Sequence, residues 1–111
     1  MTIEELSGAL ASLGMPVAYG EFLDTEENPA PDPPFITYQF ADNNDFKADN
    51  QNYAAINNID IELYTDKKDL TKEARVENKL NELRLPYRKS EVWIEAERMR
   101  QVLYQIQLIG G

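Results

Sequence analysis

Hydrophobic residues recur at helical spacing in two stretches of the chain. The first stretch predicts a helix over residues 3–13, with Ile3, Leu6, Leu10 and Leu13 on its buried face. Thr2 and Glu5 have the spacing of a capping box, and Gly14 and Pro16 end the pattern. The second stretch predicts a helix over residues 69–84, capped by Asp69 or Thr71 and ended by Pro86. Its apolar positions are Leu70, Ala74, Val76, Leu80 and Leu83.

Five other stretches have the composition or alternation of strands. Residues 15–23 form a short strand weakened by Gly20, and residues 35–41 alternate with Ile36, Tyr38 and Phe40 on one face. Residues 53–65 direct Ile59, Ile61 and Leu63 inward. Because Ile56 is out of phase with them, we expect a bulge near Asn57 and Asn58.

The last two strands are expected over residues 87–96 and 98–109. Val92 and Ile94 are the expected inward residues of the first. This phase directs Trp93 away from the core together with Tyr87, Glu91 and Glu95. The inward residues of the second are Val102, Tyr104, Ile106 and Leu108.

Two polar stretches separate these elements. Residues 24–34 hold four of the six prolines, and residues 42–52 are dense in turn formers. We expect both to be mobile loops that become ordered on contact with a partner. The sequence therefore predicts one small α+β domain over residues 1–111, in the order α-β-β-β-α-β-β, with a mostly antiparallel sheet and two helices.

The composition narrows the chemistry. The 111 residues include no cysteine and no histidine, which excludes disulfides, thiol catalysis and imidazole bases. We find no nucleophile elbow, phosphate-binding glycine loop or isolated pair of carboxylates, and the stretch DNNDFKADN lacks EF-hand spacing. We therefore expect no enzyme activity, no metal and no cofactor. Early acids and short apolar runs indicate neither a signal peptide nor a membrane span.

Charge is segregated along the chain. Residues 1–65 carry twelve acids and one lysine, whereas residues 66–111 carry eight acids and ten basic residues. This split is typical of solubilising charge, and it also fits complementary patches that meet when copies assemble. If the patches serve assembly, the acidic half of one copy meets the basic stretch from Lys67 to Arg100 of the next. Direct groove binding of nucleic acid is disfavoured, because it requires a clustered basic surface.

Several uncharged or aromatic side chains are candidates for an interface. Gln101, Leu103, Gln105 and Gln107 form an uncharged outward face on the last strand, which native proteins normally cover or pair. Trp93 is either a satellite packing residue or an interface anchor. Phe46 and Tyr64 complete the set of candidates.

The segments GMPVAYGEF, PPFITYQFADNNDF, INNIDIELYTDKKD and LPYRKSEVWIEAERMRQVLYQIQLIG carry a resemblance to a known family. The chain resembles the small tail-completion proteins, also called tail-to-head joining or tail-terminator proteins, of long-tailed bacteriophages and prophages of Gram-positive bacteria. The resemblance covers nearly the whole chain, and NNIDIELYTDKKD is its most specific piece. It implies a compact α+β fold and a ring, commonly a hexamer, that caps the tail tube and meets the head connector.

From this resemblance we expect a virion component, assembled in the bacterial host cytoplasm. Its partners would be further copies of itself, the tail tube protein and the head connector protein, with DNA only as passing cargo. Acids facing the channel would repel DNA, and the candidates are Asp42, Asp45, Asp49, Asp60 and Glu62. The alternatives are another head-side adaptor and an acidic inhibitor that mimics DNA.

Overall fold

The computed structural model of the chain describes residues 1–43 and 56–109, with the backbone alone at Asp42 and Asn43. The first helix, α1 (Ile3–Ala11), begins with the predicted capping box. The backbone N–H of Glu5 donates to Oγ1 of Thr2 at 3.1 Å, and the N–H of Thr2 donates to Oε1 of Glu5 at 3.0 Å. The helix ends two residues before the predicted boundary, and Gly14 follows at a φ of +84°. Only glycine adopts that conformation without steric cost.

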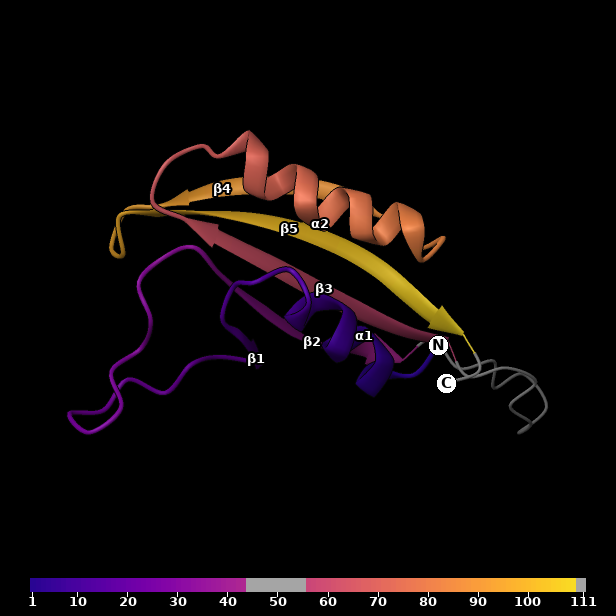
Figure 1. The fold of residues 1–111 in the computed structure, drawn as a ribbon, viewed down its shortest axis with the longest axis horizontal. Helices are drawn as coiled ribbons and strands as arrows, with labels where there is room; N and C mark the ends of the chain where they lie inside the picture. The colour runs from indigo at the N-terminus through magenta and orange to yellow at the C-terminus, as the bar shows by residue number, and fades with distance from the viewer. Residues whose placement is uncertain (44–55, 110–111) are drawn as a thin grey trace.

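The remaining elements follow in the predicted order (Figure 1). They are β1 (Val17–Tyr19), β2 (Phe35–Asn43), β3 (Ile56–Thr65), α2 (Leu70–Glu82), β4 (Arg88–Ile94) and β5 (Met99–Ile109). The strands form one sheet in the order β1-β2-β3-β5-β4. The pair β1–β2 is parallel and the other pairs are antiparallel. The α+β class predicted from the sequence is confirmed.

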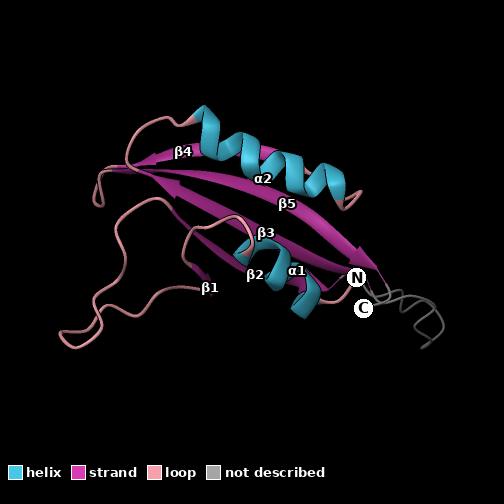
Figure 2. Cartoon of the chain, in the orientation of Figure 1, coloured by secondary structure: helices cyan, strands magenta, loops and turns pink. Residues whose placement is uncertain are grey.

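Both helices contribute to a core on one face of the sheet (Figure 2). Leu6 and Leu10 of α1 and Val76 and Leu80 of α2 are fully buried there. The sheet supplies the predicted inward residues, Ile36, Ile59, Ile61, Leu63, Val102, Tyr104, Ile106 and Leu108. Burial of this apolar area in one layer is the main stabilising contribution to the fold.

The buried face of α2 differs from the prediction. Leu70 is 69% exposed and Ala74 is exposed, whereas Glu73 is only 2% exposed. Val76 and Leu80 face the core. The residue on the same side of the helix, one turn before Val76, is Glu73 and not Ala74. The cap is Asp69, whose carboxylate accepts a hydrogen bond from the backbone N–H of Lys72 at 3.1 Å.

The bulge lies on a different strand from the one predicted. β3 pairs with β5 without interruption from Ile56 to Thr65, and the register shift lies in β2 between Phe40 and Asp42. β3 is paired on both sides, so an extra residue there would disturb two ladders. This part of β2 extends beyond β1, and bulges are common at such edges.

The faces of β4 are reversed relative to the prediction. Val92 pairs with Gln101 and is 51% exposed, and Trp93 pairs with Arg100 on the helix side. The observed phase places Tyr87 against Tyr104, with ring centroids 5.3 Å apart. It also brings Lys89 to the carboxylates of α2. With the opposite phase, these contacts would be lost, and Val92 and Ile94 would face the helices instead.

The short strand β1 covers only part of its predicted range. The chain leaves the strand at Gly20, whose φ is +78° and whose N–H donates to the carbonyl of Tyr38 at 2.8 Å. Where β2 continues past β1, the hydroxyl of Tyr19 accepts a hydrogen bond from the N–H of Phe40 at 3.2 Å. A side chain thus takes the place of a strand at this edge.

Residues 24–34 contain no helix or strand and are mostly exposed. A local turn links the backbone N–H of Asn28 to Oγ1 of Thr25 at 2.9 Å. The mobility expected for this segment stays a prediction. Of the second expected loop, residues 42–43 extend β2 and residues 44–52 lie outside the described residues.

A Schellman motif ends α2. The N–H of Leu85 donates to the carbonyl of Leu80 at 2.9 Å, and the N–H of Arg84 donates to that of Asn81 at 3.0 Å. Arg84 occupies the position where this motif favours glycine, with a φ of 59°. We expect Arg84→Gly to raise the free energy of unfolding by about 0.5–1 kcal/mol, measured by urea denaturation. Arg84→Ala is the control, and an equal gain from alanine would refute the backbone explanation.

Candidate functional site

The sheet face opposite the helices has no helix or strand over it in the described part of the chain. We call it the open face. Directly paired residues share a face, so the strand registers place its side chains in rows. The rows are Phe35, Tyr64, Gln101 and Val92; then Thr37, Glu62, Leu103 and Ser90; then Gln39, Asp60, Gln105 and Arg88; and finally Asn58 with Gln107 and Ile56 with Ile109.

Glu62 is the centre of a hydrogen-bonded group on this face. Its Oε2 accepts from the hydroxyl of Tyr64 at 2.7 Å and from Nε2 of Gln101 at 3.0 Å, and its Oε1 accepts from Nε2 of Gln39 at 3.2 Å. Nε2 of Gln101 also donates to the oxygen of Tyr64 at 2.9 Å. We call these four residues the Glu62 cluster.

The cluster holds a carboxylate with neutral donors alone. Glu62 is 7% exposed, and no ion pair involves it within residues 1–43 and 56–109. Burial raises the pKa of Tyr64, and its hydrogen bond to Glu62 raises it further. Because both carboxylate oxygens already accept hydrogen bonds, the cluster fixes side-chain orientation instead of offering a free acid or base.

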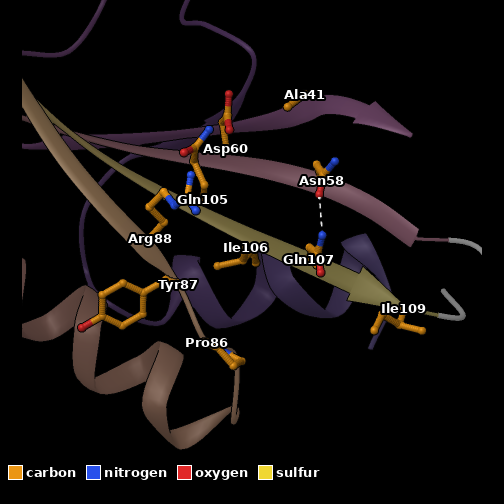
Figure 3. Close-up of a pocket in the computed structure, with 10 residues that line it drawn as sticks. All are labelled: Ala41, Asn58, Asp60, Pro86, Tyr87, Arg88, Gln105, Ile106, Gln107 and Ile109. Atoms are coloured by element: carbon orange, nitrogen blue, oxygen red, sulfur yellow. Dashed lines mark hydrogen bonds between the residues drawn. The ribbon is translucent and has the colours of Figure 1, made fainter. Parts of the chain in front are cut away.

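A shallow groove of about 670 Å³ adjoins the cluster where β4 begins (Figure 3). β4 starts at Arg88 opposite Gln105, so β5 continues beyond it through Ile109. Arg88 and Asp60 are the two charged residues lining the groove. The side chains of Gln107 and Asn58 are joined there by a hydrogen bond of 3.1 Å. Amide and apolar side chains dominate, which is typical of a contact surface for another protein.

The structure brings most of the predicted interface and channel residues together on the open face. These residues are Tyr64, Gln101, Leu103, Gln105 and Gln107 from the interface set and Asp60 and Glu62 from the channel set. Phe46, Asp45 and Asp49 lie outside the described residues, as does the side chain of Asp42. The two predicted sets therefore interleave on one surface.

Trp93 lies apart from that surface, on the helix side of β4. Its indole N–H donates to Oε2 of Glu95 at 2.6 Å, and the guanidinium of Arg100 lies 5.9 Å from its ring centroid. It is 40% exposed. The grouping of Trp93 with Tyr87 and Glu91 on one face is correct, but that face is the helix side.

Sequence reasoning missed an ion-pair network between α2 and β4. Nζ of Lys89 lies 2.8 Å from Oε1 of Glu73 and 2.7 Å from Oε2 of Glu77. Nζ of Lys68 lies 2.9 Å from Oε2 of Glu73 and 2.9 Å from Oε2 of Glu91. The spacing of Glu73 and Glu77, one helical turn apart, was the available signal.

The network changes the pKa values of its members. Burial raises the pKa of Glu77, but hydrogen bonds from Lys89 and Tyr104 outweigh it and hold this pKa below its usual value. The hydrogen bond from Lys68 lowers the pKa of Glu91. Burial, and then the hydrogen bond to Glu77 at 2.8 Å, raise the pKa of Tyr104. The network thus secures the polar inner side of β4 to α2.

Every ion pair in the described part of the chain joins two residues of the second half. The pairs involve Lys68, Lys79, Lys89 and Arg100 with Glu73, Glu77, Glu82 and Glu91. Acids described in residues 1–43 and 56–65 take part in none of them. The charge asymmetry of the sequence is therefore not neutralised by ion pairs between the two halves of the described chain.

Neither a protein-family model nor a curated protein matches the chain. Over residues 1–43 and 56–109, no three acidic side chains gather in a group that could hold a metal ion. No helix in the same ranges has the length and apolar character needed to span a bilayer.

The α2–β4 network predicts a specific acid sensitivity. Glu77 and Glu91 have lowered pKa values in the folded state, so their stabilisation is present above their ordinary pKa of about 4.5 and is lost as the pH falls through their folded values. We expect the free energy of unfolding, measured by urea denaturation, to fall below pH of about 4.5. Lys89→Met should flatten that dependence. An unchanged slope in Lys89→Met would contradict the assignment to this network.

The Glu62 cluster predicts a coupled effect on stability and on Tyr64. Glu62 accepts three hydrogen bonds through its two carboxylate oxygens, and Glu62→Gln replaces one of these oxygens with an NH2 group that cannot accept, so we expect a loss of about 1–3 kcal/mol in the free energy of unfolding. Burial, the largest cause of the raised pKa of Tyr64, remains in this variant, but the hydrogen bond to a charged Glu62 is lost, so this pKa should fall part of the way toward its ordinary value of 10.0. Ultraviolet titration of tyrosinate, compared with Tyr64→Phe, measures this. Glu97→Gln is the exposed control, and an equal effect there would exclude the cluster as the cause.

Proposed function

We propose that the protein is a non-enzymatic assembly protein of long-tailed phages or prophages, which caps the tail tube as a ring and joins it to the head connector. The observation that carries the proposal is the open face, which presents a mostly uncharged set of side chains and has no helix or strand over it in the described part of the chain. Exposed faces of this kind in assembly proteins are completed by other subunits. The resemblance of the sequence to tail-completion proteins supplies the identity of the partners.

Charge supports the same proposal. The acids of the first half form no ion pair with the second half in the described chain. Acids beside a channel repel the phosphates of DNA that passes through it, so DNA is released instead of bound. Of the channel candidates, Asp60 lines the groove, whereas Glu62 is enclosed by its neighbours. Asp60 is therefore the better residue for a test.

The DNA-mimic alternative fits the open face less well. A mimic requires a dense row of exposed acids in place of phosphates. The described side chains of the open face include two acids, Asp60 and Glu62, and one of these is 7% exposed. Arg88 adds a cation to the same face. A head-side adaptor would use the same surface, and the experiment below separates it from a tail protein.

The test uses tails and heads from a phage or prophage mutant that lacks this protein. We expect the added protein to bind the head-proximal end of the tails in electron micrographs and to restore head–tail joining. A head-side adaptor would bind the heads instead. Binding to neither particle would refute the proposal.

Asp60→Lys tests the role of charge at the channel. We expect normal joining but reduced DNA delivery, because an added cation would hold passing phosphates. Glu97→Lys makes the same charge change in the turn between β4 and β5 and should leave both steps unchanged. Loss of joining in Asp60→Lys, with a folded protein by circular dichroism, would place Asp60 in a subunit interface and contradict the channel role.

A further inference from the structure

Three basic residues share one flank of α2. Lys72, Arg75 and Lys79 follow at intervals of three and four residues, so their side chains lie along one stripe. Nη1 of Arg75 donates to the carbonyl of Leu13 at 3.5 Å, which directs this flank toward the end of α1. We call these three residues the α2 basic stripe.

The stripe retains uncompensated positive charge within the described chain. Lys79 pairs with the exposed Glu82 at 3.3 Å, and neither Lys72 nor Arg75 forms an ion pair with any described residue. The acids of α1, Glu4 and Glu5, lie in its first turn, whereas Arg75 meets the chain beyond its last turn. The acids on the other flank of α2 are occupied by Lys68 and Lys89.

A segment of opposite charge lies exposed elsewhere in the chain. Residues 21–32, the acidic segment, contain no basic residue and lie outside all helices and strands. Its acids are Glu21, Asp24, Glu26, Glu27 and Asp32, all exposed and none in an ion pair with another described residue. Leu23 within it is 74% exposed. The segment therefore combines five negative charges with the exposed apolar side chain of Leu23.

We infer that the acidic segment of one copy docks on the α2 basic stripe of a second copy. The two surfaces are complementary in charge, and no ion pair joins them within the described chain. The contact is head-to-tail, since two different surfaces meet, and such contacts close into rings when the rotation permits. The inference rests on the self-assembly in the proposed function and identifies the surfaces that carry it.

Several other charged residues of the chain are already paired within it. Lys68, Lys89 and Arg100 are engaged inside the chain, and so is Glu62, so these residues do not provide the contact. The contact proposed here uses one segment and one helix flank. Lys67, Arg84, Arg88 and Arg98, which also form no ion pair in the described chain, lie outside that flank and serve as comparison positions.

A charge-swap experiment tests the contact by sedimentation of the purified protein. Lys72→Glu with Arg75→Glu should weaken self-association by about tenfold or more, and Glu26→Lys with Glu27→Lys should do the same. An equimolar mixture of the two variants should associate again, because one copy then presents a matched pair of surfaces. Arg84→Glu with Arg98→Glu is the matched basic control, and Asp66→Lys with Glu97→Lys is the acidic one.

Several results would overturn the inference. They are a wild-type protein that stays monomeric, stripe variants that associate normally, and a mixture that fails to recover although each variant is folded. Binding of a short DNA duplex that is lost in the stripe variant, with self-association intact, would assign the stripe to nucleic acid. Wild-type association should also weaken between about 0.05 M and about 0.5 M salt.

Tail capping in the same variants separates the two proposals. Charge-dependent association without binding to tails would contradict the tail function but support the contact. Full tail capping by the stripe variants would contradict the contact and leave the tail function standing.

Discussion

The fold depends on a single apolar layer between two helices and one face of a five-stranded sheet. Because the described part of the chain places helices on that face alone, the side chains of the opposite face must be compatible with water or with their own neighbours. The Glu62 cluster meets this requirement by hydrogen bonding, at the cost of holding a carboxylate away from solvent. One-sided coverage therefore accounts both for the stability of the domain and for the surface that it leaves for other molecules.

Element order, core strands and the first helix cap could be predicted because each depends on local sequence. The capping box at Thr2 and the alternation of Ile59, Ile61 and Leu63 are signals of this kind. The phase of β4 could not be predicted, because its inner side carries the charged Lys89 and Glu91, whereas the apolar Val92 and Ile94 lie on its outer side. Hydrophobicity misassigns a strand whose inner contacts are ion pairs with a helix.

The residues of the candidate site were also predictable only in part. Alternation alone places Tyr64, Gln101 and Gln105 on a common outward face, so sequence was sufficient for them. The burial of Glu62 was not predictable, because it requires Gln39 and Gln101 to approach from strands on both sides. Contacts between strands distant in sequence follow from register, and register is set by the whole sheet.

The hydrogen bond from the N–H of Phe40 to the hydroxyl of Tyr19 has a consequence for solubility. A row of unpaired backbone N–H and C=O groups at a sheet margin is a template with which a foreign strand pairs, so each such donor that is satisfied within the chain weakens the template. The hydroxyl of Tyr19 accepts from that donor, and its ring packs against Tyr38 and Phe40 with centroid distances of 5.3 Å and 6.2 Å. At this position of the β2 margin, a side chain rather than an additional strand thus satisfies the backbone donor with which a foreign strand would pair.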